Sequence, residues 1–438
     1  MRMVSREVMV IGGSITGIQT AIDLANRGFK VYLIEASPSI GGRMAQLDKT
    51  FPTNDCSICI LAPKMIECYQ HPNVVPWTYS EVIGISGTVG NFKVKVKKKT
   101  RYVDQEKCTG CGECIEKCPT KVDNEFDMEM GLRKAVYIPF PQAVPRKVTI
   151  DPKNCKKLTT GKCGVCKKVC QRGAIDYEMK DEIVELDIGA IVVCTGFDFY
   201  DMTKMPEYGY GKFPNVVTAM EFERLLNASG PTMGHLVRAS DHKEPKTVAF
   251  VQCAGSRDER HRPYCTGVCC MHSIKEAILA HEHDDKVETY IFYIDLRTGG
   301  KNFYEYKVRA GKDYKVNYIR AKVGRITTDD AGNPVLWYED TRGRALKSMT
   351  VDMVVLAQAL IASKGTQEVV KALGLDIDEY GFIKVPDELR RPMDTTVPGI
   401  FACGFCQAPM DIPESVAQGS GAAARVSEIL EGSGPTVQ

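Results

Sequence analysis

Hydrophobic and polar positions near the start of the chain follow the order strand, turn, helix, strand. Four segments carry this order: an apolar run at 8–11, a Gly-rich turn at 12–17, a helical spacing of apolar residues at 18–25, and a second apolar run at 31–34. Short continuous apolar runs are typical of strands buried on both faces of a parallel sheet. The pattern therefore predicts a βαβ unit.

The α/β pattern is interrupted and then resumes. A charged, cysteine-rich segment follows the Lys-rich run 93–101 and ends at Asp181-Glu182, and a loop-rich stretch reaches about residue 245. Apolar runs predict strands at 188–193, 247–251, 289–294, 351–357, 382–385 and 397–402, and helical spacing predicts helices at 274–281 and 413–430. We therefore expect two α/β parts, the first carrying an insertion.

Composition narrows the class of protein. The 438 residues carry a formal net charge of +2, which gives no global basic field for binding nucleic acid. No apolar run is long enough for a membrane span, and no signal peptide is recognisable, so we expect a cytoplasmic protein with no direct membrane insertion. Eighteen cysteines are unusual there, because cytosolic thiols are kept reduced. Metal ligation or redox chemistry is the expected use of these cysteines.

The first turn has the spacing of a dinucleotide-binding motif. Gly12, Ser14 and Gly17 occupy the positions of GxGxxG, with Ser14 in place of the middle glycine. The helix that follows offers free N–H groups to a phosphate, and Glu35 ends the second strand, where a carboxylate can bind ribose hydroxyls. The alternative is a merely structural turn, which would leave Glu35 unexplained.

The clearest chemical motif is a group of four cysteines followed by Pro119. Cys108, Cys111, Cys114 and Cys118 match the C-x2-C-x2-C-x3-C-P spacing of bacterial ferredoxins. This spacing predicts a [4Fe–4S] cluster. Zinc is the alternative, although zinc sites usually use two separated C-x2-C pairs.

A second group predicts a second cluster. It consists of Cys155, Cys163, Cys166 and Cys170, with Gln171 in place of the expected proline. In two-cluster ferredoxins the fourth cysteine of each run ligates the other cluster. We therefore expect Cys170 to join the first three cysteines of the first group, and Cys118 to join the rest of the second.

A third group lies in the second α/β part. Cys253, Cys265, Cys269 and Cys270 fall within eighteen residues. So many cysteines favour a metal site over packing, although two adjacent ligands are unusual for a cubane cluster. The spacing alone leaves both interpretations open.

Further strings resemble the flavoprotein class that includes thioredoxin reductase. Ile34-Glu35 with Gly41-Gly42-Arg43-Met44, then Cys194-Thr195-Gly196, and the string 399–404 carry the resemblance, which implies FAD in the first part. The class ordinarily has Asp where this chain has Phe405, so Asp411 is one candidate for the ribityl contact. The implied FAD-binding residues are Gly12, Gly13, Ser14, Thr16, Gly17, Glu35, Gly42, Arg43, Thr195, Gly196, Gly404 and Val416. The class also implies a nicotinamide site in the second part, but 252–257 lacks its glycine fingerprint.

The string around the third cysteine group strongly resembles the family of heterodisulfide reductase A subunits. The matching residues are 253–258, 263–265, 268–270 and 274–275, and the string 55–65 is also similar. The resemblance implies an unusual [4Fe–4S] cluster at Cys253, Cys265, Cys269 and Cys270. It also implies that Lys275 lies near the isoalloxazine ring as a catalytic residue, the alternative being a solvated helix lysine. The roles of Cys56, Cys59 and Cys68 stay open.

Together these observations predict an α/β fold, a two-domain thioredoxin-reductase-like flavoprotein of Rossmann type with an inserted two-cluster ferredoxin domain. The FAD-binding domain is expected at 1–98, 183–245 and 363–438, the ferredoxin-like insertion at 99–182, and a second Rossmann-like domain at 246–362. The expected cofactors are one FAD and three [4Fe–4S] clusters.

The expected function is that of a flavin and iron–sulfur electron-transfer subunit. Within the family, the short layout most resembles the A subunits of quinone-interacting membrane-bound oxidoreductase complexes. This resemblance implies a relay, or a bifurcation or confurcation, between a membrane quinone pool and a soluble acceptor such as adenylylsulfate reductase in sulfate reduction. The implied partners are sister redox subunits, one of them membrane-embedded, which would hold the protein at the cytoplasmic membrane. Three alternatives stay open: a bifurcating heterodisulfide reductase component of the A type, an NAD(P)H-dependent reductase, and a zinc-holding scaffold.

Overall fold

The computed structural model describes residues 5–341 and 343–431, which form two compact units. Unit 1 comprises the described residues of 1–45, 59–197 and 362–438, and unit 2 comprises 46–58 and 198–361. Each unit contains a five-stranded parallel sheet with helices, so the predicted α/β class is confirmed. Within the described residues, no helix combines the length and the apolar character that crossing a membrane requires.

The parallel sheet of unit 1 positions most of the predicted flavin-binding residues at one edge. Its order is β24 (Ile400–Ala402), β13 (Ala190–Val193), β1 (Glu7–Ile11), β2 (Lys30–Glu35) and β5 (Val74–Thr78). Val10 in β1 pairs with Val192 on one side and Leu33 on the other. Because these strands are parallel, their carboxyl ends meet at a single edge.

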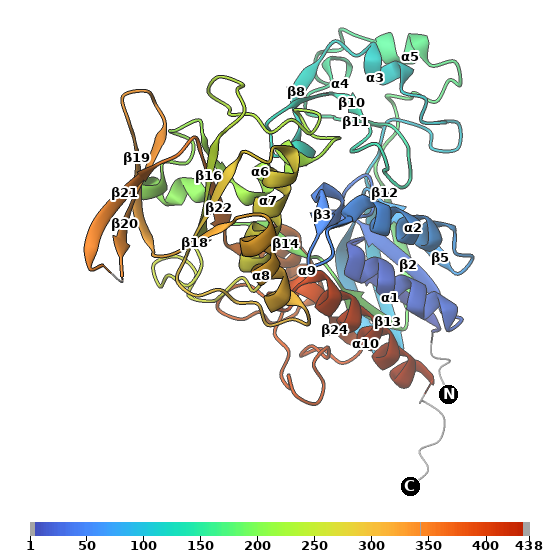
Figure 1. The fold of residues 1–438 in the computed structure, drawn as a ribbon. Coiled ribbons are helices and arrows are strands. Elements are labelled where there is room, and N and C mark those ends of the chain that lie inside the picture. The colour runs from blue at the N-terminus through green and yellow to red at the C-terminus, as the bar shows by residue number, and fades with distance from the viewer. Residues whose placement is uncertain (1–4, 342, 432–438) are drawn as a thin grey trace. The chain divides into compact units, whose positions relative to one another are not determined.

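Helices complete this part of unit 1. α1 (Ile15–Asn26) and α10 (Ile412–Glu431) pack against each other, as Figure 1 shows. Gly419 allows the close approach, since a Cβ there would lie 2.9 Å from the backbone oxygen of Thr16. The unit also contains η1 (Gly42–Gln46), α2 (Ser57–Gln70), α9 (Lys364–Leu373) and η5 (Gly404–Cys406).

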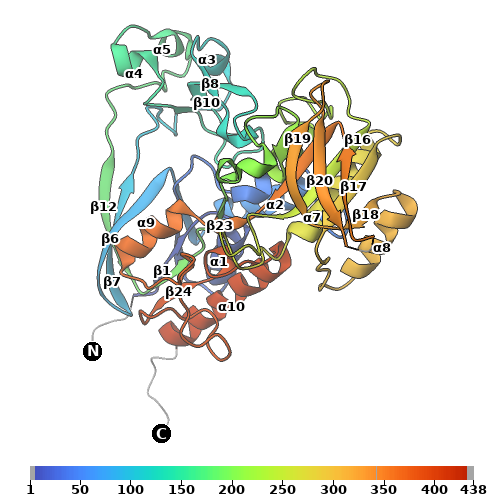
Figure 2. The ribbon, with the colours of Figure 1, turned by 90° about the vertical axis from the view of Figure 1, so that its left-hand side faces the viewer.

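A three-stranded antiparallel sheet carries the insertion. It consists of β6 (Ser80–Thr88), β7 (Asn91–Lys98) and β12 (Glu182–Ile188), seen together in Figure 2. β7 pairs with β12 from Phe92 and Ile188 to Lys98 and Glu182. The chain therefore leaves for the insertion and returns from it at neighbouring strand ends, which leaves the parallel sheet intact.

The insertion is small and has its own core. Its elements are α3 (Glu113–Glu116), β8 (Lys121–Asp123), η2 (Glu125–Asp127), β9 (Leu132–Lys134), β10 (Val136–Tyr137), β11 (Thr149–Ile150), α4 (Lys156–Thr160) and α5 (Val165–Val169). Five of its twelve buried core residues are cysteines. A core built so largely of thiols supplies little hydrophobic stabilisation, so we expect its stability to depend on bound metal.

Unit 2 has the second parallel sheet. Its order is β15 (Val216–Thr218), β22 (Met353–Gln358), β16 (Thr247–Ala254), β17 (Glu288–Tyr293) and β18 (Asn317–Arg320). The helices are η3 (Met202–Lys204), η4 (Pro206–Tyr208), α6 (Ala219–Leu226), α7 (Cys269–His283) and α8 (Phe303–Asp313). Shorter strands are β3 (Lys49–Thr50) and β4 (Asp55–Cys56), and an antiparallel sheet follows in β19 (Val323–Thr328), β20 (Pro334–Asp340) and β21 (Ala345–Thr350). The chain passes between the units along β14 (Phe197–Phe199) and β23 (Leu360–Ala362).

Two predictions about local structure were wrong. The segment 382–385 is not a strand: Ile383 makes one isolated bridge, with Ile377, and its N–H donates to Cys406. Gly381 before the segment has a positive φ of +91°, and Pro386 after it has no N–H to donate. Too few residues therefore remain between them to form a strand with regular backbone pairing. The stretch before residue 245, expected as loops, contains α6, whose capping box joins Thr218 and Glu221. The Thr-x-x-Glu signal for this helix was present in the sequence.

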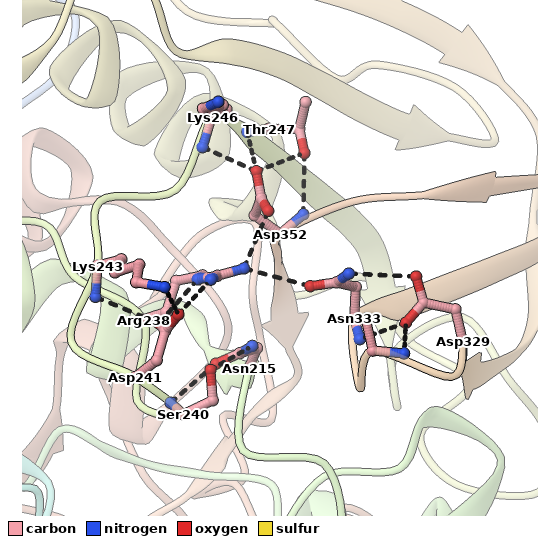
Figure 3. A network of polar contacts seen from close by, with 11 residues as sticks. Asn215, Arg238, Ser240, Asp241, Lys243, Lys246, Thr247, Asp329, Asn333 and Asp352 are labelled. Carbon is pink, nitrogen blue, oxygen red and sulfur yellow. Dashed lines mark hydrogen bonds and ion pairs between the residues drawn. The ribbon is translucent and has the colours of Figure 1, made fainter.

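A polar network fastens the loop after α6 to the starts of two parallel strands (Figure 3). Asp352 accepts hydrogen bonds from the N–H groups of Lys246 and Thr247, at 2.8 and 3.0 Å, and from the Thr247 hydroxyl. Arg238 bridges Asp352 and Asp241 and also donates to Asn333. One carboxylate therefore holds the amino-terminal ends of β16 and β22 together with the loop.

We predict that Asp352→Ala lowers the free energy of unfolding of unit 2 by about 2 kcal/mol, because several donors lose their acceptor at once. Trp337 lies in unit 2 and Trp77 in unit 1, so urea unfolding followed by tryptophan fluorescence in a Trp77→Phe background reports on unit 2. Asp330→Ala, at an exposed position, is the matched control and should have little effect. Equal destabilisation by both variants would contradict the assignment.

Candidate flavin and iron–sulfur sites

The turn after β1 has the geometry of a phosphate-binding loop. Gly12 has a φ of +107°, and a Cβ at this residue would lie 2.3 Å from the backbone oxygen of Cys194. Ser14 precedes α1 without capping it, and its hydroxyl donates to the same oxygen at 3.2 Å. The first-turn N–H groups of α1 are thus left to a ligand, which fits the pyrophosphate of a dinucleotide.

Glu35 is fixed at the end of β2. Its Oε2 accepts the N–H of Gly13 at 2.7 Å, and its Oε1 accepts the N–H of Ser37 at 2.7 Å. The carboxylate is therefore held beside the turn, with further lone pairs for hydroxyl donors. This arrangement fits a ribose.

The remaining predicted flavin-binding residues lie in the same unit. Gly42 approaches Ser14, since a Cβ on Gly42 would lie 3.2 Å from the Ser14 Cα. Thr195 and Gly196 follow β13, and the N–H of Gly404, after β24, donates to Gln418 in α10 at 2.9 Å. The residues singled out from the sequence thus gather from the ends of β1, β2, β13 and β24.

The position that lacks the usual Asp is occupied by a buried ring. Phe405 packs against Phe197 at a centroid distance of 4.6 Å and against Phe382 at 6.2 Å. Asp411, the candidate for the ribityl contact, accepts the N–H of Glu414 and so begins α10. Asp411 therefore has a structural task whether or not it contacts FAD.

The cysteines of the insertion lie close enough to affect one another electrostatically. Burial and then the neighbouring thiols of Cys108, Cys166, Cys111 and Cys170 raise the pKa of Cys114 to about 12. Cys170 is thus near the first three cysteines, as the crossed ligation predicts, but Cys166 of the other expected set is near Cys114 as well. Cluster iron holds such sulfurs as thiolates, and four converging thiols are the donor set that a cubane requires.

Cys118 lies near a cysteine of the second group. Burial raises the pKa of Cys166, the hydroxyl of Tyr177 opposes this, and the thiols of Cys155 and Cys118 raise the pKa further. The assignment of Cys118 to the second set stays a prediction. Tyr177, whose oxygen is 2.9 Å from the Cys166 Sγ, was not identified from the sequence.

Four cysteines also converge in unit 2. Cys253 is the next-to-last residue of β16 and has a φ of +60°, and Cys269 and Cys270 begin α7. Burial and then the thiols of Cys270 and Cys265, partly offset by Arg257, raise the pKa of Cys253 to about 11. The adjacent cysteines thus face a common group of sulfurs, and this donor set fits a cluster.

The remaining cysteines differ in their surroundings. Cys56 and Cys59 are disulfide-bonded, whereas the other sixteen are free. Cys194 and Cys403 end neighbouring strands of unit 1 with their sulfurs 3.3 Å apart, and Cys406 is fully buried. Cys68 is buried in α2. Cys194 lies against Gly12 and Gly17 of the turn, whereas the roles of Cys56, Cys59 and Cys68 stay open.

Lys275 is a buried ion-pair residue, not a solvated one. Its side chain is 1% exposed, and its Nζ lies 2.7 and 2.6 Å from the two carboxylate oxygens of Glu223. Burial alone would raise the pKa of Glu223, but Lys275 and His272 outweigh burial and hold it below its ordinary value. His272 also contacts Glu276, at 2.9 Å, and burial raises the pKa of Glu276.

This buried cluster was not found from the sequence beyond Lys275. Glu223, His272 and Glu276 have ligand atoms within 4.8 Å of one another. The ammonium of Lys275 already lies against Glu223, where it supplies the positive charge that a metal ion would bring. We therefore interpret the cluster as an ion-pair network. The i, i+4 spacing of His272 and Glu276 on α7 was the one available signal.

Comparisons with known proteins agree with this picture. The model of a 4Fe-4S binding domain matches residues 101–122, and that of an NAD(P)-binding Rossmann-like domain matches residues 10–62. The A subunit of the H(2):CoB-CoM heterodisulfide,ferredoxin reductase of Methanothermobacter thermautotrophicus is 46% identical over 97% of this chain and 64% of its own length. An iron-sulfur A subunit of the CoB--CoM heterodisulfide reductase of Methanopyrus kandleri is 48% identical over 98% of this chain and 65% of its own length. The chain belongs to the family of heterodisulfide reductase A subunits.

Other relatives and solved structures extend the comparison. A protein of Archaeoglobus profundus, described as similar to heterodisulfide reductase A subunits, is 44% identical over 98% of this chain and 66% of its own length. This family member thus spans about two thirds of the length of these relatives. Thioredoxin reductases from T. acidophilum and Lactococcus lactis share the fold, each with a TM-score of 0.54 at 16% identity, over 96 and 97% of this chain and 98 and 99% of theirs. The predicted thioredoxin-reductase-like flavoprotein fold with a 4Fe–4S domain is confirmed.

We predict that Gly12→Ala abolishes FAD retention, because its Cβ would collide with the backbone of Cys194. Gly28→Ala is the matched control: Gly28 also has a positive φ, of +84°, but no atom lies within 4 Å of its Cβ position. The flavin absorbance of the purified protein, relative to protein concentration, measures retention. Equal loss in both variants would show that backbone strain, not the close approach, is responsible.

We predict that Lys275→Met destabilises unit 2 by about 3–5 kcal/mol, because it leaves the Glu223 carboxylate buried without its partner. Adding Glu223→Gln should recover part of this loss. Lys286→Met, at an exposed position, is the control. Unfolding in urea, followed through Trp337, gives the coupling between the two residues, and strictly additive effects would contradict a direct ion pair.

Proposed function

We propose that this chain is the FAD and iron–sulfur electron-transfer subunit of a multi-subunit oxidoreductase. The observation that carries the proposal is that a match to a 4Fe-4S binding domain at residues 101–122 and two further four-cysteine groups occur in a chain that has a flavoprotein fold. FAD exchanges two electrons with a partner or one at a time, whereas each cluster carries one. The protein's part is to hold these groups and to set their potentials.

The proposed ligand sets are those expected from the cysteine spacing and from the resemblance to the family. The first cluster is bound by Cys108, Cys111, Cys114 and Cys170, the second by Cys118, Cys155, Cys163 and Cys166, and the third by Cys253, Cys265, Cys269 and Cys270. FAD lies at the strand ends of unit 1, with Glu35 on the ribose and the first turn of α1 on the pyrophosphate. The expected role of Lys275 at the isoalloxazine ring stays a prediction, because its ammonium donates to both carboxylate oxygens of Glu223 and to the backbone oxygen of Lys49.

The first two clusters belong to a module that is firmly joined to the flavin-binding sheet. Arg101, 2% exposed, donates to the hydroxyls of Thr149 in the insertion and Thr78 in β5, and to the backbone oxygen of Pro38. Ile40 forms a bridge with Val144 of the insertion. These contacts support the proposal that electrons pass between the insertion and the FAD held by the dinucleotide loop along a fixed path.

The proposal also concerns which partners donate electrons to this chain and which accept electrons from it. The motif resemblance to QmoA, as the A component of the quinone-interacting complexes is called, favours a relay between a membrane quinone pool and adenylylsulfate reductase, through sister subunits at the membrane. The names of the relatives favour the alternative, a bifurcating component that serves a heterodisulfide reductase. Identification of the subunits that co-purify from native membranes distinguishes the two: a membrane-embedded protein supports the first, and heterodisulfide reductase subunits support the second.

An NAD(P)H-dependent reductase is the remaining candidate. The matching Rossmann-like model covers residues 10–62, and the turn after β16 lacks the glycine fingerprint of a second dinucleotide site. The proposed subunit should therefore not be reduced directly by nicotinamide cofactors. Rapid bleaching of the flavin in the isolated chain by NADH or NADPH would overturn this proposal in favour of the reductase.

We predict about twelve iron atoms, as much acid-labile sulfide, and one FAD per chain after anaerobic purification. Cys265→Ser should lower the iron to about eight, because it removes a ligand of the third cluster. Cys68→Ala is the control, since Cys68 is buried in α2 outside the three sets, and it should keep the full complement. Iron, sulfide and flavin analysis measures these values, and zinc in place of iron would contradict the function.

A further inference from the structure

In the second cysteine set of the insertion a side chain donates a hydrogen bond to a cysteine sulfur, whereas in the first set a backbone group does so. In the second set, the Tyr177 hydroxyl lies 2.9 Å from the Cys166 Sγ. A sulfur bound to iron has no proton, so the hydroxyl must be the donor. A tyrosine hydroxyl is protonated at neutral pH, so it is available as a donor. In the first set the donor is a backbone group, the N–H of Ala174, 3.3 Å from the Cys170 Sγ.

Tyr177 is held in place by the backbone. Ile175 forms a bridge with Val103, and the N–H of Asp176 donates to Tyr102 at 3.1 Å. The Tyr177 ring packs against the core of the insertion. The hydroxyl is therefore positioned by the pairing of two chain segments, and it does not depend on a flexible side chain reaching across the surface.

Charge separates the two sets further. We call residues 104–118 the first loop and residues 153–172 the second loop. The first loop contains four acidic and two basic residues, whereas the second contains seven Lys or Arg residues and no acidic residue. Lys153 and Lys156, which lie on either side of Cys155 of the second set, are exposed. In the described part of the chain, none of the seven basic side chains of the second loop forms an ion pair.

The hydrogen bond from Tyr177 and the positive charge of the second loop both raise the reduction potential of a cluster. Reduction adds negative charge to a cluster that is already anionic with its four thiolates, so hydrogen bonds to sulfur and nearby positive charges favour the reduced state. The exposed lysines act through water and are screened by salt, whereas the hydroxyl acts at contact distance. Exposure of Cys111 to solvent favours reduction of the first cluster, but the acidic residues of the first loop oppose it.

We propose that Tyr177, together with the basic second loop, raises the reduction potential of the second cluster above that of the first. The inference rests on the proposed function, since it requires both clusters. Tyr177 then acts through Cys166 to set which of the two clusters has the higher reduction potential. The second cluster is then the end of the insertion that accepts electrons. The second loop is then the face at which the insertion exchanges electrons with a partner.

The test is an anaerobic redox titration of the whole cluster-loaded chain, followed by electron paramagnetic resonance. We predict that Tyr177→Phe moves the higher of the two insertion midpoints to a more negative potential and leaves the lower one unchanged, at low and high salt alike. Tyr102→Phe is the matched control, because Tyr102 packs against the same core and, among the described residues, its hydroxyl has no hydrogen bond to a cysteine. This control should move neither midpoint.

Charge variants assign the midpoints to the loops. Lys153→Glu with Lys156→Glu, on either side of Cys155 of the second cluster, should move the same midpoint as Tyr177→Phe, in the same direction, and by less at high salt. Glu106→Lys with Glu113→Lys, beside the first-cluster cysteines Cys108 and Cys114, should instead raise the other midpoint. If Tyr177→Phe leaves both midpoints in place, or moves the lower one, the inference is wrong. If no cubane signals are present in the unaltered chain, the proposed function fails first, and the two failures are thereby distinguished.

Discussion

The antiparallel ladder between β7 and β12 is the constraint on which the architecture of unit 1 depends. Its pairs run from Phe92 and Ile188 to Lys98 and Glu182, so the insertion begins and ends on neighbouring strands. Only Gly189 separates β12 from β13, which lies beside β1 in the parallel sheet. A cluster-binding module of about eighty residues can therefore be carried by a flavoprotein fold without disturbing the strand order that places the dinucleotide turn.

Buried charge is the second physical theme of the structure. Arg101 and Lys275 are each almost fully buried, and each is compensated by a different means: Arg101 by neutral oxygen acceptors, and Lys275 by the carboxylate of Glu223. Neutral acceptors bind the terminal nitrogens of Arg101, while its buried Nε has no hydrogen-bond partner among the described residues. No carboxylate compensates its charge, and burial accordingly lowers its pKa to about 10. Removing Thr149 or Glu223 would thus have unequal costs, because an unpaired buried charge is far less tolerable than a lost neutral acceptor.

Much of the site chemistry could be predicted from local spacing. The cysteines Cys108, Cys111 and Cys114 of the ferredoxin-like run lie within seven residues, and the turn residues Gly12 to Gly17 lie within six. Such motifs are set by the geometry of a few consecutive peptide units, so they can be recognised without the fold. The same reasoning failed at 382–385, where an apolar run resembles a strand but pairs only at Ile383, and before residue 245, where the capping box of α6 was overlooked.

The sequence by itself determined the chemical identity of the groups: thiols at cluster spacing, a glycine turn before a helix, and a carboxylate at the end of the second strand. Only the tertiary structure decided which distant residues act on them. Glu223 contacts Lys275, 52 residues further along the chain, because α6 packs against α7. Tyr177 contacts Cys166 because residues 174–176 pair with residues 102–104. Such contacts depend on the packing of elements that are distant along the chain, and no local spacing encodes them.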